Sequence, residues 1–233
     1  MTSIVAGTVF AGGYMGRLSN PAGSFSELFP RSVGAAQTWL SGEVFALFPE
    51  EARAVGNAVA KRRSEFSAGR HCARLAMAQL GHLACAIPSG PDRAPVWPSG
   101  LVGSITHSAE LCAAVVARSD CFRSVGIDTE LIDAIPAELV DDILRPDEAG
   151  EIDRHARPDG ADWPTLYFCL KEAAYKAFYP ICRQIIGFQD MRLRVDPEAR
   201  SFLAELPGLF ASGIPIFQGR YLVRHGRVHA ACW

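Results

Sequence analysis

Long hydrophobic runs and an excess of charge of either sign are both missing from this 233-residue sequence. The longest uninterrupted apolar run, Leu111 to Ala117, is far shorter than the roughly 20 residues that a membrane-spanning helix needs. Lysine and arginine number 23 against 25 acidic residues, so we expect neither nucleic acid nor a membrane as a partner. The first basic residue is Arg17, which leaves the start without the positive charge of a secretory signal.

Cysteine is present but is not organised for a structural role. The seven cysteines make an odd number, and no C-x-x-C pair occurs, which argues against a disulfide framework or a zinc site. Most have apolar neighbours, as Cys112 does in Leu111-Cys112-Ala113-Ala114. We therefore expect buried free thiols and a reducing, cytoplasmic location.

Helical periodicity is clearest in two stretches. Apolar or small residues recur every three or four positions from Arg63 to Leu80, and again over residues 163–179. Short apolar runs predict strands over Leu101–Thr106, Leu111–Ala117 and Ser124–Glu130. The fold class is therefore α+β, with a helix in each half packed against short strands.

Weaker patterns fill in the rest of the chain. A helix start at Pro49 continues towards Ala60, and the Pro- and Gly-rich stretch Pro88–Gly100 predicts a loop. The polar segment Ile132–Asp162 has the composition of a surface connection between two halves and contains a short helix over Ala137–Leu144. Further strands are expected near Ile4, over Arg192–Val195 and over Arg220–Arg224.

The first cluster that could carry chemistry is Gly126-Ile127-Asp128-Thr129-Glu130. In a strand, Asp128 and Glu130 point to the same face, about 6.6 Å apart. Gly126 leaves space on that face for a bulky ligand. Hard carboxylate oxygens with room for water suit Mg²⁺ rather than zinc. Two surface acids at a solvated strand end would produce the same short pattern.

A second cluster, Lys171-Glu172-Ala173-Ala174-Tyr175-Lys176, lies in the predicted helix over residues 163–179. Phe168, Glu172 and Lys176 follow one another at intervals of four residues and share a helix face. A surface ion pair between Glu172 and Lys176 would explain this spacing. The rest of the helix is so apolar that it should be packed, however, which places these charges at an interface or cleft. Glu172 could then add a third carboxylate to the strand pair.

Two basic features could hold phosphate. The first helix carries arginines, whose planar guanidinium groups bind phosphate in a bidentate manner, although a solvated helix face explains them equally well. Arg62 lies nearly a quarter turn from Arg70, so both would hold one ligand only if Arg62 lies at or before the helix start. His107 ends a strand in Gly103-Ser104-Ile105-Thr106-His107-Ser108, beside hydroxyl and backbone N–H groups. The arginines concerned are Arg62, Arg63, Arg70 and Arg74.

Together, these clusters resemble the surfactin-type family of 4′-phosphopantetheinyl transferases, especially its enterobactin-synthase-component-D-like branch. The paired G-x-D-x-E and K-E-A-x-x-K motifs are the specific part of the resemblance, which runs from about residue 60 to about residue 180. Phe168 stands where many members of the family have tryptophan. The segments that carry the resemblance are Ala60–Phe66, Gly69–Arg74, Pro95–Pro98, Gly103–His107, Gly126–Glu130 and Lys171–Lys176.

The resemblance implies two similar α/β halves, residues 1–122 and 123–233, that form a pseudo-dimer with coenzyme A in the cleft between them. It implies an enzyme that moves the 4′-phosphopantetheine arm of coenzyme A onto a serine hydroxyl of an apo acyl or peptidyl carrier protein and releases adenosine 3′,5′-bisphosphate. Because both halves lie in one chain, a monomer is sufficient.

Roles for individual residues follow from the same resemblance. Asp128, Glu130 and Glu172, with the carbonyl of Thr129, would hold Mg²⁺ against the pyrophosphate. Glu172 or a metal-bound water would accept the serine proton, and Lys176 would stabilise the pyrophosphate oxygens. The remaining contacts to coenzyme A are expected from Arg62, Arg70, Ser89, Gly90, Pro91, Asp92, Thr106 and His107. Two alternatives stay open: a Mg²⁺-dependent hydrolase of a nucleotide or pyrophosphate, and a binding module for coenzyme A without catalysis.

Overall fold

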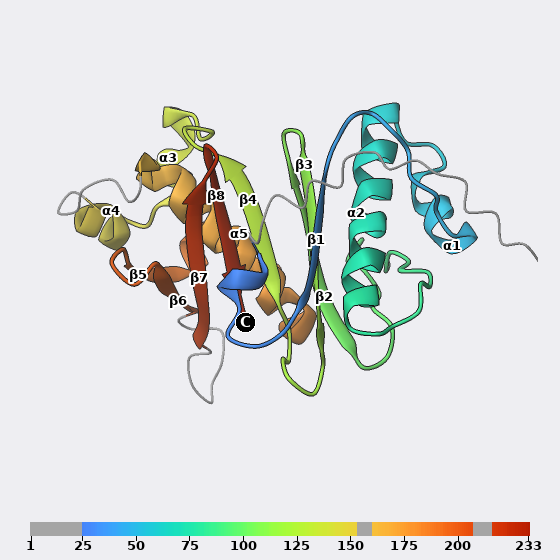
Figure 1. The fold of residues 1–233 in the computed structure, drawn as a ribbon. Helices are drawn as coiled ribbons and strands as arrows, with labels where there is room; N and C mark the ends of the chain where they lie inside the picture. Colours follow the sequence, from blue (N-terminus) through green and yellow to red (C-terminus); the bar gives the residue numbers. More distant parts are fainter. Residues whose placement is uncertain (1–24, 153–159, 207–215) are drawn as a thin grey trace, which may run out of the picture.

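Two 20-residue helices, α2 (Ala60–Gln79) and α5 (Trp163–Cys182), each cover one face of an antiparallel sheet. The computed structural model describes residues 25–152, 160–206 and 216–233, so the strand expected near Ile4 lies outside the described residues. Figure 1 shows the two helix-and-sheet units side by side. The predicted α+β class and both long helices are confirmed. Within the described ranges, no helix is long and apolar enough to span a membrane.

The N-terminal sheet has the strand order β1-β3-β2. Its central strand, β3, alternates between two apolar surroundings, which explains why its sequence is continuously apolar. Ala114 and Val116 pack in the cluster beneath α2, while Ala113, Val115 and Ala117 pack in the cluster at the junction with the other sheet. The strands of this sheet are β1 (Gly34–Trp39), β2 (Leu101–Ser108) and β3 (Leu111–Arg118).

The helix that starts at Pro49 is shorter than the sequence predicts. Helix α1 covers only Pro49–Ala52 and passes into a 3-10 turn over Arg53–Val55. Gly56 and Asn57 follow, and neither favours a helix interior, so the chain turns there and α2 begins anew at Ala60. The expected continuation towards Ala60 is therefore wrong. All seven cysteines are free, as predicted, and four of them are buried: Cys72, Cys112, Cys169 and Cys232.

The C-terminal sheet has the strand order β4-β8-β7-β6-β5 and is antiparallel throughout. Helix α5 packs mainly on β4 and β8. Asp162 caps its N-terminus by accepting the Thr165 N–H at 2.8 Å, and Arg183 ends it in the left-handed conformation, with φ at 53°. The strands are β4 (Gly126–Leu131), β5 (Arg192–Asp196), β6 (Ser201–Glu205), β7 (Ile216–Arg224) and β8 (Arg227–Cys232).

Gly126 allows close helix packing and does not leave space for a ligand, as the sequence had suggested. A Cβ atom built on Gly126 would lie 1.9 Å from the carbonyl oxygen of Ala173 in α5. Gly34 has the same relation to α2 in the other unit, where a Cβ would lie 1.9 Å from the Ala76 carbonyl oxygen. In both units a glycine therefore lets the helix backbone rest directly on the first strand.

The polar segment Ile132–Asp162 does not connect the two units. It joins β4 to α5 within the C-terminal unit, and the described part of it includes a 3-10 turn over Ala137–Leu139 followed by α3 (Val140–Ile143) and α4 (Pro146–Ile152). The expected helix over Ala137–Leu144 is thus realised as two short turns. The chain passes between the units earlier, in the connection between β3 and β4.

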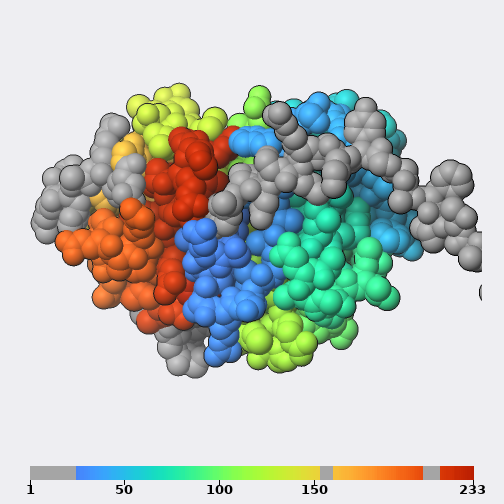
Figure 2. All heavy atoms as spheres, in the orientation of Figure 1, coloured from blue at the N-terminus to red at the C-terminus, as the bar shows by residue number. Residues whose placement is uncertain are grey.

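Apolar side chains from both sheets fill the junction between the units. Phe25, Leu28 and Phe29, which surround a 3-10 turn ahead of β1, pack there against β3, β4 and β8. Figure 2 shows the blue N-terminal part of the described chain lying between the red C-terminal strands and the teal region of α2. Across the junction, the Ile127 N–H donates to Ser104 Oγ at 3.1 Å. This contact places the middle of β2 beside β4.

Candidate active site

The two sequence motifs meet at an ion pair between α5 and β4. Lys176 Nζ lies 2.6 Å from Asp128 Oδ1, and the Thr106 hydroxyl on β2 donates to the same oxygen at 2.8 Å. The Asp128 side chain is 4% exposed, whereas that of Lys176 is 27% exposed. The pair is therefore buried at its acidic end and open at its basic end, where the ammonium group can meet a ligand.

This contact decides between the two interpretations of the K-E-A-x-x-K helix. In the described part of the chain, the ion-pair partner of Lys176 is Asp128 on the neighbouring strand and not Glu172 on its own helix. A surface ion pair between Glu172 and Lys176 is therefore the wrong interpretation. Glu172 is half-buried and lines a cavity that Lys176 does not line.

Burial and mutual repulsion act on the carboxylates around this ion pair. Burial raises the pKa of Glu172, against the charge of Lys176, and the Asp128 carboxylate raises it further. Burial likewise raises the pKa of Glu130, against a hydrogen bond from Ser108 Oγ at 2.5 Å, and Asp128 again adds to the rise. Burial alone would lower the pKa of Lys176, but the charge of Asp128, the hydrogen bond to it and the charge of Glu172 together outweigh burial, so the pKa is raised.

The acidic groups fit a hard cation such as Mg²⁺ in their chemistry. Asp128 Oδ2 is buried and accepts no hydrogen bond from any described residue, so a cation there would satisfy it. A cation would also relieve the repulsion of Asp128 on Glu130 and Glu172. In the part of the chain that the structure describes, however, no three acidic, histidine or cysteine side chains are already placed to hold one metal ion together.

Thr129 turns its side chain away from this cluster. Its hydroxyl lies 3.0 Å from Nδ1 of His229 on β8, and both residues are buried. Since neighbouring residues of a strand face opposite sides, Thr129 could reach the acidic face only through its carbonyl group.

Arg62 and Arg70 each lie near the ring of Phe66. Their guanidinium carbons lie 6.0 Å and 4.3 Å from the centre of the Phe66 ring, although α2 begins ahead of Arg62. Arg70 is buried, and it donates from Nε to the Ile87 carbonyl at 2.6 Å and from Nη2 to Ser89 Oγ at 3.2 Å. Burial lowers the pKa of Arg70 to about 10.

The other two arginines of the predicted basic face have internal partners. Arg63 donates to the Ala58 carbonyl at 2.9 Å, and Arg74 forms a 2.8 Å ion pair with Glu51, whose side chain is fully buried. Because α2 begins at Ala60, Arg62 lies inside the helix, and the condition set for one ligand shared with Arg70 is not met. His107, near the end of β2, is exposed to solvent; partial desolvation by its neighbours lowers its pKa, and the charges of Arg62 and Lys176 add to that effect against Glu65.

A cavity of about 740 Å³ lies between the loop Gly90–Trp97, strand β2 and the last turns of α5. Lys176 lines it, as do Gly90, Pro91 and Asp92, three of the four loop residues that the sequence singles out. The fourth, Ser89, is the hydroxyl that Arg70 contacts.

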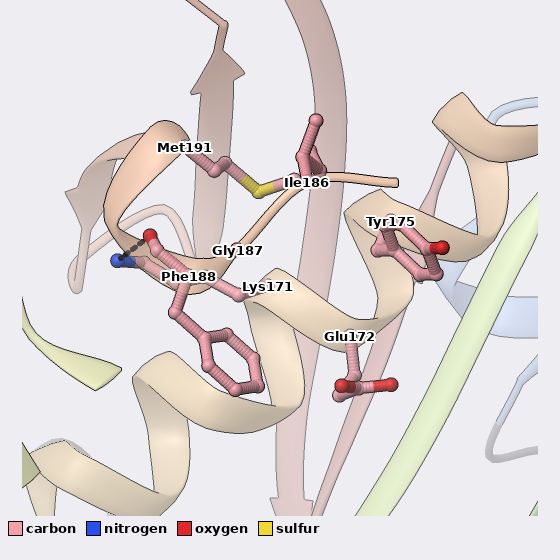
Figure 3. Close-up of a pocket in the computed structure, with 7 residues that line it drawn as sticks. All are labelled: Lys171, Glu172, Tyr175, Ile186, Gly187, Phe188 and Met191. Carbon is pink, nitrogen blue, oxygen red and sulfur yellow. Dashed lines mark hydrogen bonds between the residues drawn. The ribbon is translucent and has the colours of Figure 1, made fainter. Parts of the chain in front are cut away.

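A smaller cavity, of about 170 Å³, lies between α5 and the segment Ile186–Met191. Figure 3 shows Glu172 and Tyr175 projecting from the helix, with Ile186 and Met191 on the opposite wall. Tyr175 lines both this cavity and the larger one. Glu172 and Lys176, one helical turn apart, therefore border two adjoining cavities.

Comparison with known proteins identifies the family. Residues 50–117 match the family model described as "4′-phosphopantetheinyl transferase N-terminal domain", and residues 124–231 match that of the "4′-phosphopantetheinyl transferase superfamily". The chain belongs to the 4′-phosphopantetheinyl transferase superfamily. The resemblance that the two motifs indicate is confirmed.

Named relatives agree with this assignment. The chain is 39% identical to the 4′-phosphopantetheinyl transferase PptT of Mycobacterium tuberculosis over 191 residues, which is 78% of this chain and 84% of the relative. It is 39% identical to the transferase Svp of Streptomyces mobaraensis over 201 residues, 81% of this chain and 78% of the relative. Enterobactin synthase component D of Escherichia coli is 36% identical over 124 residues, 50% of this chain and 55% of the relative.

The site of this transferase also contains residues that sequence reasoning missed. Lys171, the first residue of the K-E-A motif, is fully buried and donates to Glu148 Oε2 at 2.7 Å, to the Ile143 carbonyl at 2.8 Å and to the Phe188 carbonyl at 3.0 Å. Figure 3 shows the last of these contacts. The position of this lysine in a largely apolar helix was the feature of the sequence that could have indicated a buried ion pair. Its partner Glu148 lay in a segment taken for a surface connection.

Arg227 is a second missed residue. It is 6% exposed, donates to the Ser108 carbonyl at 3.2 Å and lies over the Trp39 ring, with its guanidinium carbon 5.9 Å from the ring centre. It thereby ties β8 to the turn that follows β2, where Ser108 contacts Glu130. No sequence signal pointed to it, because the contacts depend on how the two sheets are placed.

Proposed function

We propose that this transferase moves the 4′-phosphopantetheine arm of coenzyme A onto a serine of an apo carrier protein, and that it requires Mg²⁺. One observation carries the proposal: the lysine of K-E-A-x-x-K pairs with the aspartate of G-x-D-x-E at the border of two adjoining cavities. Because the chain belongs to this family, we interpret the contact between the two motifs as the site of phosphopantetheinyl transfer.

The two cavities suggest how coenzyme A lies. The larger one would take the nucleotide, with its phosphates near Lys176, which lines the cavity. His107, Arg62 and Arg70 are not among the lining residues, so they would contact a phosphate that extends beyond this lining. The smaller one has the apolar side chains Ile186, Phe188 and Met191 in its walls and would take the uncharged arm. The pyrophosphate would then lie between them, close to Asp128 and Glu172.

In the reaction, the serine oxygen forms a bond to the phosphorus that carries the arm. The bond from that phosphorus to the bridging oxygen breaks, and adenosine 3′,5′-bisphosphate leaves. Glu172, which lines the smaller cavity beside this point, would accept the serine proton. Lys176 faces the negative charge that develops on the leaving oxygen. A Mg²⁺ ion held by Asp128, Glu130, Glu172 and the Thr129 carbonyl would neutralise charge on the pyrophosphate.

We also propose that the two units are related halves of a pseudo-dimer, divided between residues 122 and 123. Each consists of a strand, a 20-residue helix and further antiparallel strands, and in each a glycine of the first strand touches the helix backbone. Because one chain supplies both walls of the cleft, a monomer of the proposed enzyme is sufficient for activity. We place it in the cytoplasm, with acyl or peptidyl carrier proteins as its partners.

The Asp128→Asn variant tests the site. It removes the negative charge that binds Lys176 and would bind the cation, and we expect it to lower transfer by about 100-fold or more. Asp120→Asn is the matched control, since it removes an exposed ion pair with Arg118 that borders neither cavity. Transfer by the natural chain should stop when a chelator removes Mg²⁺ and resume when Mg²⁺ is restored. Full activity of Asp128→Asn, or of the chelated enzyme, would contradict the proposed site.

A further inference from the structure

The loop that borders the larger cavity is a small hairpin with Asp92 at its tip. The Gly90 N–H donates to the Ala94 carbonyl at 2.8 Å, and the Val96 N–H donates to the Pro88 carbonyl at 2.8 Å. Pro91 and Asp92 occupy the two central positions of its turn, a place that proline's fixed φ suits. The Arg93 N–H donates to the Gly90 carbonyl at 2.9 Å and closes this turn. These hydrogen bonds lie within the hairpin, so its position relative to α5 depends on contacts with that helix.

Asp92 provides those contacts across the cavity. Its Oδ2 accepts the Tyr179 hydroxyl at 2.9 Å and Arg183 Nη1 at 2.6 Å, and its Oδ1 accepts the Ala94 N–H at 3.1 Å. The hydrogen bond from Tyr179 is the main reason that the pKa of Asp92 is lowered, so the carboxylate is charged at neutral pH. Both partners lie at the C-terminal end of α5, 87 and 91 residues away in sequence.

All three side chains belong to the lining of the larger cavity. Asp92 comes from its loop wall, and Tyr179 and Arg183 come from its helix wall, so the bridge fixes the separation of the two walls. Lys176 lies on the same helix, one turn before Tyr179, and also lines the cavity. The bridge therefore sets the position of the hairpin relative to the lysine that is proposed to meet the pyrophosphate.

We infer that Asp92, Tyr179 and Arg183 form a strut that holds the Ser89–Asp92 hairpin in place to receive the nucleotide of coenzyme A. This inference rests on the proposed function, which puts the nucleotide in that cavity. In the strut, Asp92 is a positioning residue: its carboxylate is occupied by α5 and does not face the ligand's phosphates, which it would repel. Arg183 likewise acts on the hairpin and not on the coenzyme.

Breaking the strut should weaken binding moderately. An exposed ion pair contributes little to stability, so the hairpin would detach part of the time without unfolding the protein. Coenzyme A would then have to order it on binding, which reduces affinity by the fraction of molecules in which the hairpin is detached. We expect the Kd for coenzyme A to rise by about two- to fivefold, with kcat at saturating coenzyme A unchanged.

A double-mutant cycle tests this inference. Calorimetry would give the Kd for coenzyme A of Asp92→Asn, Arg183→Gln and the double variant, with Asp120→Asn as a control for the loss of an exposed ion pair elsewhere. Asp92→Asn should weaken binding at least as much as Arg183→Gln, which leaves the Tyr179 hydrogen bond in place, and the double variant should be no worse than Asp92→Asn. Tyr179→Phe, which removes only the hydroxyl donor, should have a smaller effect of the same sign.

Hydrogen–deuterium exchange of the free protein provides a readout that does not depend on coenzyme A. The amides of Gly90 and Val96 should exchange faster in Asp92→Asn and Arg183→Gln than in the natural chain or in Asp120→Asn. Unchanged exchange at these amides would overturn the strut. If the natural chain failed to bind coenzyme A while the exchange changed as expected, the proposed function would fail and the strut would stand.

Two binding results would overturn the inference. Additive losses in the double variant would mean that Arg183 contacts the coenzyme directly and independently of Asp92. Tighter binding by Asp92→Asn would mean that Asp92 blocks the cavity and must be displaced. A fall in kcat that saturating coenzyme A does not restore would place these residues in the chemistry and not in the positioning of the hairpin.

Discussion

Replacing Lys171 by methionine tests whether the first residue of the K-E-A motif stabilises the fold or takes part in the chemistry. Methionine keeps much of the side-chain volume but removes the ammonium group. The Glu148 carboxylate would then remain buried without its counter-charge, since both side chains are 1% exposed and lie 2.7 Å apart. The carbonyl groups of Ile143 and Phe188 would lose their donor as well.

The magnitude follows from these contacts. Removing one partner of a buried ion pair costs about 3–5 kcal/mol. For a chain of this length each kcal/mol lowers Tm by about 2–4 °C, so Lys171→Met should lower Tm by roughly 6–20 °C. Adding Glu148→Gln removes the stranded charge but keeps an acceptor for the backbone N–H groups of Leu193 or Arg145, and it should recover part of the loss.

Thermal unfolding followed by circular dichroism would measure these shifts, with transfer assayed at a temperature where both variants are folded. We expect the Lys171→Met protein to retain its kcat under those conditions. A Tm within about 2 °C of the natural chain combined with a large loss of kcat would refute the reasoning, because Lys171 would then act on the reacting groups.

Three further changes have definite outcomes. Lys176→Ala should lower kcat by at least about tenfold, and it should also lower Tm because Asp128 loses its partner; a normal kcat would remove Lys176 from the site. His225 has φ at 53° in the two-residue turn before Gly226, so His225→Asn should raise Tm slightly in thermal unfolding, and a lower Tm would contradict this. Burial and the Arg74 charge lower the pKa of His71 in the folded protein, so the unfolded chain takes up this proton first and the free energy of unfolding falls as the pH drops below about 6.5. In urea unfolding, His71→Phe, which can keep the stacking on Phe45, should lose less stability between pH 7 and 5 than the natural chain. An equal loss would contradict the lowered pKa.

The elements that the sequence predicts best are those whose pattern reports one local environment. The run Leu111–Ala117 is apolar on both faces and is a strand covered on both faces. The stretch over residues 163–179 has a helical period and helix ends that match α5 closely. The start at Pro49 failed because a local start signal says nothing of where Gly56 and Asn57 will end the helix.

The candidate site was predictable as a set of residues but not as a set of contacts. Sequence spacing placed Asp128 and Glu130 on one strand face and Glu172 with Lys176 on one helix face. It could not show that Lys176 would choose Asp128 over Glu172, because that choice depends on the approach of α5 to β4. The role of Gly126 was misjudged for the same reason.

The sequence did not predict which distant residues would form ion pairs. Glu148 is paired with a lysine 23 residues away, and Asp92 with an arginine 91 residues away. Each acidic residue lies in a polar stretch that is typical of exposed loops. Only the packing of α5 against these segments brings the charges together.

Intact mass spectrometry of an apo carrier protein tests the central claim most directly. The natural chain, Mg²⁺, coenzyme A and apo carriers from fatty-acid, polyketide and peptide synthases would be incubated together, and both the carrier and the nucleotide products would be weighed. We predict that at least one carrier gains the mass of the phosphopantetheine arm on its serine, with an equal amount of adenosine 3′,5′-bisphosphate released. Carriers of unchanged mass, whether coenzyme A stays intact or is hydrolysed, would contradict the account.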